Sequence, residues 1–174
     1  TDIRDFMAAE RALENWSFAE AFEKYGPFAE AGVSLAQYRL GEMYETGPVE
    51  TRNIGMAVEF YKKAASRRFA LAFSRIGKLY SENHTLGINL IEAYKWLNLG
   101  AHFGDFASVP IRTALKAKMS LAELLQAQEE SSSMLRKNWS GSDKRKKIFD
   151  SLNEVYGELE GTFRYAEIID GRSL

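Results

Sequence analysis

The residues best suited to acid–base or metal chemistry in this chain of 174 residues are its two histidines, His84 and His102. Histidine changes its charge near neutral pH and is a common metal ligand. Neither has a second histidine or a cysteine at metal-ligand spacing. His84 lies in a loop-like stretch, SENHTLG, and His102 ends a helical segment. Solvation in a loop and charge complementarity at a helix end explain both, so we expect no metal site, no cofactor and no catalytic residue.

Other catalytic signatures are missing from the sequence as well. The chain has no G-x-S-x-G, H-E-x-x-H or phosphate-loop pattern, and its lack of cysteine excludes disulfides and thiol nucleophiles. Carboxylates occur in close pairs, such as Glu42 with Glu45 and Glu129 with Glu130. Neighbouring glutamates are usual on an exposed helix face and single out no acid–base pair. We therefore expect a protein that is not an enzyme.

The charge balance restricts the classes of partner. The chain has 23 Lys and Arg residues against 24 Asp and Glu residues, a net charge of −1. Proteins that bind nucleic acid or anionic membranes usually carry a basic surface, so the composition argues against both partners. No apolar run reaches the roughly 18 residues that a membrane-spanning helix needs, so we expect no membrane insertion.

The elements that position these residues follow from an internal repeat. Residues 36–47 read AQYRLGEMYETG and residues 72–83 read AFSRIGKLYSEN, with alanine, an aliphatic residue, glycine and tyrosine at an offset of 36 residues. The aligned positions are Ala36 with Ala72, Leu40 with Ile76, Gly41 with Gly77, and Tyr44 with Tyr80, and, in three copies, Ala21, Ala57 and Ala93; Tyr25, Tyr61 and Leu97; Ala29, Ala65 and Ala101; and Gly32, Arg68 and Gly104. A 36-residue period of two helical segments is typical of a helical solenoid.

Helix signals recur with the same period. The residues Ala36, Leu40 and Tyr44 are four apart and predict one apolar helix face. Gly41 weakens that helix by about 1 kcal/mol relative to alanine, so we expect close approach of the neighbouring helix to compensate. Preferred N-cap residues recur as Ser17, Asn53 and Asn89, and capping boxes are predicted at Ser17–Glu20, Asn89–Glu92 and Ser120–Glu123.

With these residues in view, AQYRLGEMYETG followed by AVEFYKKAA resembles the Sel-one-like repeat, a relative of the tetratricopeptide repeat. The match is close in residues 36–68 and looser in residues 72–104, where Ser74 stands in the position of Tyr38. The resemblance implies an all-α, right-handed helical-repeat solenoid (an α–α superhelix). The implied repeat region, residues 1–104, divides into a degenerate unit at 5–32 and full units at 33–68 and 69–104.

The repeat stops after residue 104. Residues 105–139 resemble the helical pair that closes such arrays, and an end unit needs a polar outer face to stop further stacking. Residues 140–174 resemble no family; an apolar stripe predicts a C-terminal helix that packs on the cap or takes a partner helix, followed by a tail. A secondary patch for an acidic partner or phosphate, alternatively a solvated helix turn, is Lys144, Arg145, Lys146 and Lys147.

The resemblance implies partner binding in the concave groove of the solenoid, which the first helix of each unit lines. We expect the groove to be formed by first-helix positions outside the apolar stripe, and Tyr38 and Phe73 stand out because exposed aromatics anchor interfaces. The alternative is that both aromatics are buried between repeats. The groove candidates are Gln37, Tyr38, Glu42, Glu45, Phe73, Ser74, Lys78 and Ser81.

The function that the resemblance implies is a non-catalytic adaptor or scaffold that binds another protein, as a monomer or weak homo-oligomer. An immunity protein that neutralises a bacterial toxin is the alternative, and an enzyme is the least favoured class. Proteins that open with a unit like DFMAAERALENW often follow a signal peptide, which favours the bacterial periplasm. Removal of an initiator methionine before Thr1 would give the same start in the cytoplasm, so the compartment stays open.

Overall fold

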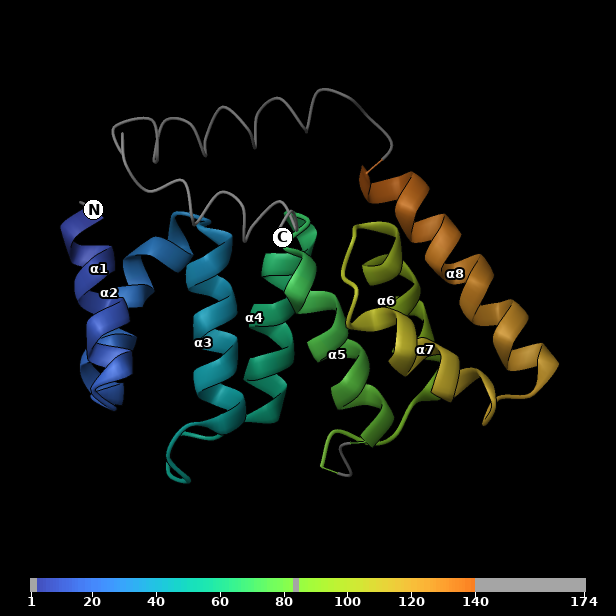
Figure 1. Ribbon diagram of the computed structural model, residues 1–174, viewed down its shortest axis with the longest axis horizontal. Helices are drawn as coiled ribbons and strands as arrows, with labels where there is room; N and C mark the ends of the chain where they lie inside the picture. Colours follow the sequence, from blue (N-terminus) through green and yellow to red (C-terminus); the bar gives the residue numbers. More distant parts are fainter. Residues whose placement is uncertain (1–2, 83–84, 140–174) are drawn as a thin grey trace.

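The computed structural model describes residues 3–82 and 85–139, and these residues form eight α-helices without a β-strand (Figure 1). Consecutive helices pair as the two halves of successive units. The helices are α1 (Ile3–Glu14), α2 (Phe18–Glu30), α3 (Ser34–Thr46), α4 (Ile54–Ser66), α5 (Ala70–Glu82), α6 (Leu90–His102), α7 (Ser108–Lys116) and α8 (Leu121–Trp139). The predicted all-helical solenoid is confirmed.

The helices stand side by side in chain order, so that each unit packs on the next (Figure 1). The tightest pairings are within units, α3 with α4 and α5 with α6, and α2 and α4 each join their unit to the following one. Because contacts run mainly between neighbours along the chain, stability is close to a sum of unit and interface contributions.

Two glycines set the distance between the helices of a unit. A Cβ atom on Gly41 would lie 2.6 Å from the ring of Tyr61, and one on Gly77 would lie 2.4 Å from Cγ of Leu97. Tyr61 and Leu97 are themselves repeat-equivalent, so the same contact occurs in both units. The expected close approach at Gly41 is therefore confirmed, and it explains why the helix tolerates the propensity cost.

The predicted side-chain caps at the helix starts form at Asn53, Asn89 and Ser120 but not at Ser17. The side chains of Asn53 and Asn89 accept bonds from backbone N–H groups three residues later, at 3.0 Å in both cases. Ser120 and Glu123 form a complete capping box, in which each side chain bonds the other residue's backbone N–H group. Ser17 makes no side-chain cap bond, because its ψ of 68° is not extended. The prediction of a capping box there is wrong.

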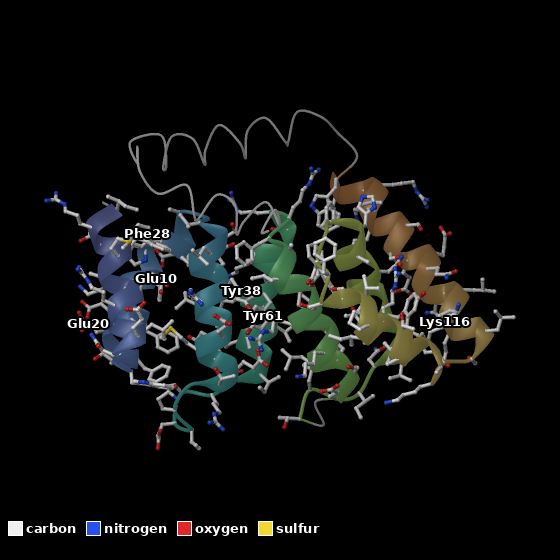
Figure 2. All side chains as sticks on the ribbon, viewed as in Figure 1. Glu10, Glu20, Phe28, Tyr38, Tyr61 and Lys116 are labelled. Atoms are coloured by element: carbon white, nitrogen blue, oxygen red, sulfur yellow. The ribbon has the colours of Figure 1, made fainter. Side chains whose placement is uncertain are left out.

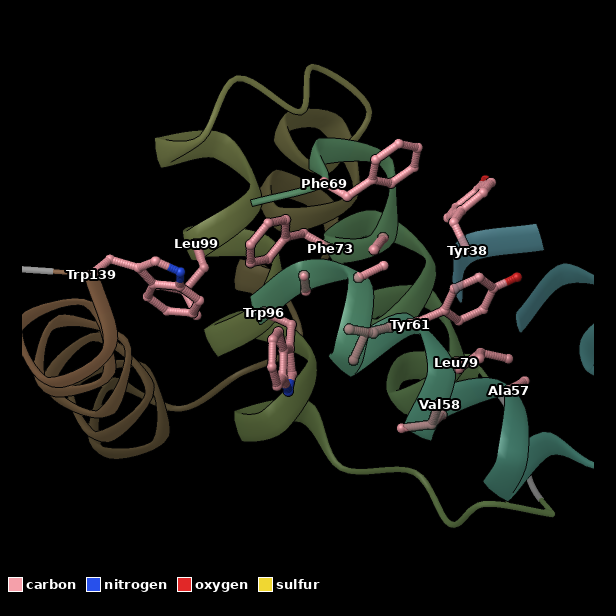
Figure 3. Close-up of a cluster of buried hydrophobic side chains, with 14 residues drawn as sticks. Tyr38, Ala57, Val58, Tyr61, Phe69, Phe73, Leu79, Trp96, Leu99 and Trp139 are labelled. Atoms are coloured by element: carbon pink, nitrogen blue, oxygen red, sulfur yellow. The ribbon is translucent and has the colours of Figure 1, made fainter. Parts of the chain in front are cut away.

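The end of α8 is fastened to the middle of the array. Trp139 lies beside Phe73 in the buried cluster (Figure 3). It also packs on Phe103, and its indole N–H donates to the carbonyl of Ser66 at 3.1 Å. Arg68 donates to the carbonyl of Trp139 at 3.3 Å, and its guanidinium lies over the ring of Phe103. The cap therefore closes the array through one aromatic cluster that reaches back to α4.

Arg68 adopts a backbone conformation that its repeat equivalents leave to glycine. Its φ is 65°, where Gly32 and Gly104 have φ of 88° and 86°. A left-handed conformation costs a non-glycine residue about 1–2 kcal/mol. The contacts of its side chain with the end of α8 offset part of that cost.

Several predictions lie outside the described residues. They are the basic patch at 144–147, the C-terminal helix and tail at 140–174, and the loop position of His84.

Candidate interaction surface

Four of the eight predicted groove residues are buried within the chain itself. The exposed fractions of Gln37, Tyr38, Phe73 and Ser74 are 5%, 6%, 0% and 8%. Their expected exposure in a groove is therefore corrected: in this structure these four side chains offer no open surface to a partner. Figure 2 shows Tyr38 in the interior, beside Tyr61.

Both aromatics are buried, as the alternative interpretation expected: Tyr38 packs on its own and the following unit, and Phe73 packs inside its own unit and on the end of α8. The ring of Tyr38 lies 5.4 Å from that of Tyr61 and 5.0 Å from that of Phe69. The ring of Phe73 stacks on Phe103 at 5.3 Å. A helix in the middle of a solenoid has neighbours on several sides, so the apolar stripe visible in the sequence is only part of its buried surface.

The two buried polar residues, Gln37 and Ser74, each form a hydrogen bond with a residue outside their own unit. The amide Nε2 of Gln37 donates to the carbonyl of Ala29 at 3.0 Å. The backbone N–H of Ser74 donates to Asp105 Oδ2 at 2.9 Å, and that same oxygen accepts from the hydroxyl of Ser108. Buried polar groups need such partners, and the side-chain nitrogen of Gln37 and the backbone N–H of Ser74 have them.

The other predicted positions remain accessible to different degrees. Lys78 is exposed, and Ser81 is partly exposed. The side chains of Glu42 and Glu45 are 22% and 15% exposed, and both are engaged by arginines that the sequence analysis did not select. The arginines are Arg39 on α3 and Arg75 on α5.

The first half of this network joins α1 to α3. Arg39 donates to both carboxylate oxygens of Glu10, at 3.1 and 3.0 Å, and its remaining nitrogen donates to Glu42 at 2.9 Å. The hydroxyl of Tyr25 also donates to Glu10, at 2.6 Å. Bidentate contacts of this kind are the strongest form of arginine–carboxylate pairing.

The second half joins α3 to α5. Arg75 donates to Glu42 at 3.2 Å and to the hydroxyl of Tyr38 at 3.3 Å. It also lies 3.7 Å from Glu45, whose other oxygen accepts a 2.5 Å bond from the hydroxyl of Tyr61. Glu42 is thus shared by two arginines, and the network runs unbroken over three successive first helices.

The glutamate-to-arginine contact repeats with the units. Glu10 and Arg39 are 29 residues apart, and Glu42 and Arg75 are 33 apart. The difference of four equals the difference between the connections inside the units, three residues at 15–17 and seven at 47–53. The two contacts therefore occupy equivalent places. A search for Glu and Arg at repeat-equivalent positions, corrected for loop length, would have found them.

Burial and the network shift the tyrosine pKa values in one direction. Burial, together with the nearby charge of Glu42, raises the pKa of Tyr38 to about 12, although Arg75 acts in the opposite sense. Burial and the bond to Glu10 raise the pKa of Tyr25, and burial and the bond to Glu45 raise that of Tyr61. All three phenols are protonated at neutral pH and act as donors or acceptors, not as bases.

The network ends at Arg75, and the next charged residue on α5, Lys78, lies outside it. This residue is 36 positions after Glu42, so a cation stands where the preceding unit has its shared carboxylate. Lys78 is exposed, and Leu71, one helical turn before Arg75 on the same helix, is 45% exposed. We call the accessible side of α1, α3 and α5 the first-helix face, and define it by Arg39, Glu42, Leu71, Arg75 and Lys78.

The described part of the chain contains neither a metal-binding group of side chains nor a membrane-spanning helix. No group of three or more His, Asp or Glu side chains there is arranged to hold a metal ion. His102 is exposed, and its ring meets that of Phe103 edge-on. None of the helices in residues 3–82 and 85–139 is long and apolar enough to cross a membrane.

Comparison with known proteins agrees with this geometry. Residues 34–68, which contain α3 and α4, match the family model of the Sel1 repeat, the Sel-one-like repeat described above. The fold is similar to that of c5321, a protective antigen present in uropathogenic Escherichia coli strains that displays an SLR fold, with a TM-score of 0.62 over 78% of this chain. The chain therefore contains a Sel1 repeat at residues 34–68 and has a Sel1-like helical-repeat fold.

The similarity to c5321 is one of fold and covers only part of that protein. Sequence identity to c5321 is 18%, so the likeness concerns the fold, and this Sel1-like chain matches 28% of the length of c5321. No curated protein matches the chain in sequence. The Sel1 repeat and the helical-repeat fold together indicate a protein–protein interaction module.

Proposed function

We propose that the protein is a non-catalytic adaptor that binds another protein through the first-helix face. The proposal is carried by one observation: the charged side chains of three successive first helices form a single bonded network on an accessible face. The predicted role in partner binding is kept for Glu42 and Lys78, and the buried residues Tyr38 and Phe73 are replaced by Arg39 and Arg75.

A network of this kind suits recognition because it fixes the side chains before a partner arrives. Arg39 is held by Glu10 and Glu42, and Arg75 by Glu42 and Glu45. Less conformational entropy is then lost on binding than with free arginine side chains. Exposed Leu71 supplies apolar area, and Lys78 adds a cation outside the network, so the face combines an apolar contact with charges that select a partner.

The test uses affinity capture from the organism that encodes the protein, with two charge-reversal variants compared. Leu71→Ser with Lys78→Glu alters the first-helix face, and Lys63→Glu makes the same charge reversal on an exposed part of α4. We expect one stoichiometric partner with wild type and with Lys63→Glu, and its loss with the first-helix variant. A partner that both variants retain, or a failure to capture any partner, would overturn the proposal. Circular dichroism melting confirms that the variants fold.

A further inference from the structure

A second candidate surface is a cleft between α6, α7 and α8, separate from the first-helix face. Its volume is about 500 Å³, within the range usual for ligand sites. Helices α7 and α8 each pack on α6 but make few contacts with each other, which leaves the cleft open between them. The lining residues are Asn98, Leu99, Ala101, His102, Val109, Arg112, Ser131, Ser132 and Leu135.

The polar side of the cleft is built around Arg112. Its Nη1 donates to Asn98 Oδ1 at 2.7 Å, Asn98 Nδ2 donates to the hydroxyl of Ser131 at 2.8 Å, and that hydroxyl donates to the carbonyl of Gln128 at 2.9 Å. Ser131 is 1% exposed, so the chain of bonds is anchored in the interior. The guanidinium therefore has a fixed orientation.

Arg112 differs from Arg39 and Arg75 in having no carboxylate partner within the described residues. Its bond to Asn98 uses Nη1, which leaves Nε and Nη2, the other edge of the planar fork, without an acceptor in that part of the chain. That edge presents two parallel donors, the arrangement that binds a carboxylate bidentately. The hydroxyl of Ser132 and the exposed ring of His102 lie in the same cleft.

The apolar side of the cleft restricts the ligand further. Val109 is 41% exposed and Leu135 is partly exposed, so these two supply the apolar surface, whereas Leu99 is 1% exposed and contributes almost none. None of the lining residues is acidic. An inorganic anion would leave this apolar wall unused, and a neutral apolar group would leave the guanidinium unpaired.

We propose that this cleft binds a carboxylate that is attached to an apolar side chain, as in a peptide. The carboxylate pairs with the free edge of Arg112, and the apolar group packs on Val109 and Leu135. The source is either the terminal carboxylate of a chain or an acidic side chain beside an apolar residue. This proposal does not depend on the first-helix face being a binding surface.

The first experiment titrates the isotopically labelled full-length protein with 4-methylpentanoate and follows backbone amide shifts. We expect saturable shifts around residues 98, 112 and 131, with a Kd of about 1 mM for so small a ligand. The neutral isostere 4-methylpentanamide and inorganic phosphate should each bind at least about 10-fold more weakly, because one lacks the charge and the other the apolar group. Equal binding of the amide or of phosphate, or no binding of the carboxylate, would overturn the proposal.

Variants then locate the site. Arg112→Gln should weaken binding of 4-methylpentanoate about 10-fold and Arg112→Lys should restore it only in part, since lysine keeps the charge but lacks the fork. Lys116→Gln, which removes an exposed cation from the same helix outside the cleft, should leave the Kd unchanged. Unchanged binding by Arg112→Gln would overturn the proposal, and the amide spectra show whether each variant keeps its fold.

Two peptides distinguish the sources of the carboxylate. Acetyl-Ala-Leu carries only a terminal carboxylate, and acetyl-Leu-Asp-amide carries only a side-chain carboxylate. Tighter binding of the first assigns the cleft to a chain terminus, and tighter binding of the second assigns it to an internal acidic segment. If neither peptide shifts the amides of the cleft, a peptide ligand is ruled out.

Discussion

Arg39 and Arg75 on first helices of the repeats are bonded in the opposite way to Arg112 on α7. Arg39 and Arg75 each lie between two glutamates, and the resulting bonds join one unit to the next. Arg112 in the cap bonds to the neutral side chain of Asn98 and has no carboxylate partner among the described residues. The charges of Arg39 and Arg75 are neutralised by glutamates within the fold. The guanidinium of Arg112 is held by Asn98 and could still pair with an external carboxylate.

The spacing of the three arginines shows how small a change separates these roles. Arg39 and Arg75 are 36 residues apart, which is the repeat period, but Arg75 and Arg112 are 37 apart. The connection before α7 has five residues, 103–107, where that before α5 has three, 67–69, so α7 is out of register with the first helices of the repeats. The side chain of Arg112 accordingly bonds to α6 and lines the cleft, in place of a contact with the preceding first helix.

The largest effect is expected at Glu10, which anchors the network in the first unit. Glu10 is 8% exposed and binds both Arg39 and Tyr25. Glu10→Gln removes the charge that compensates a half-buried guanidinium, so the free energy of unfolding should fall by about 3 kcal/mol. Urea denaturation followed by circular dichroism measures the change.

Glu20 provides the matched control. It lies at the outer edge of the molecule, with its side chain 56% exposed and 3.6 Å from Lys24 (Figure 2). An exposed i,i+4 pair contributes about 0.3–0.5 kcal/mol, so Glu20→Gln should change stability by no more than that. Similar effects of the two substitutions would mean that the network is no more than a surface feature.

The second prediction concerns pH, because Tyr38 has its pKa raised to about 12. An unfolded tyrosine ionises near pH 10, so between about pH 10 and pH 12 the folded state holds more protons than the unfolded state. Its contribution is complete below pH 10 and is lost as the pH rises through the folded pKa. Between pH 9 and 12, Tyr38 alone should account for a loss of about 2 kcal/mol of stability.

Tyr38→Phe tests this contribution by comparison. The variant should lose about 2 kcal/mol less stability than wild type over the same pH range, since it has no phenol to ionise there. Tyr25 and Tyr61 stay in the variant and shift in the same direction, so part of the alkaline loss should persist. Parallel pH profiles of the two proteins would contradict the assignment.

The third prediction compares the two classes of arginine directly. Arg75→Gln breaks contacts with Glu42, Glu45 and Tyr38, so it should cost about 1.5 kcal/mol of stability. Arg112→Gln loses one bond to a neutral amide, which glutamine can partly replace, so it should cost less than about 0.5 kcal/mol. The urea midpoints of the two variants, compared at an equal dependence of unfolding free energy on urea concentration, measure the two losses. Equal losses of stability would contradict the distinction between Arg75 and Arg112.

The architecture could be predicted because it depends on features that repeat. The offset of 36 residues, the glycines at 41 and 77, and the cap residues Asn53 and Asn89 indicate stacked helix pairs without any knowledge of contacts. Local capping could be predicted less well. Ser17 has a suitable side chain, but the three-residue connection at 15–17 places it in a conformation from which it cannot cap.

The surface could be predicted only in part, because exposure depends on neighbours outside the helix. Tyr38 and Phe73 lie outside the apolar stripe of their helices, but Tyr38 packs on Phe69 of the following unit and Phe73 packs on Phe103 and on Trp139 of α8. Arg39 and Arg75 resemble ordinary surface charges until their distance from Glu10 and Glu42 is corrected for loop length. The cleft depends on how α7 and α8 pack separately on α6, for which the sequence carries no periodic signal.

The smallest predicted effect comes from extending the network by one step. On α3, Arg39 and Glu42 are paired three residues apart, but on α5 the equivalent pair is Arg75 and Lys78. Lys78→Glu would create the missing i,i+3 pair and remove a like-charge neighbour, so it should raise stability by about 0.3–0.5 kcal/mol at low salt. Lys78→Gln isolates the second contribution, because it removes the repulsion without adding a carboxylate. The gain of Lys78→Glu over Lys78→Gln should disappear at about 1 M salt, because exposed charges are then screened. If it persists, the new carboxylate binds Arg75 as the buried members of the network do, and the cation at Lys78 is the reason that the network stops where it does.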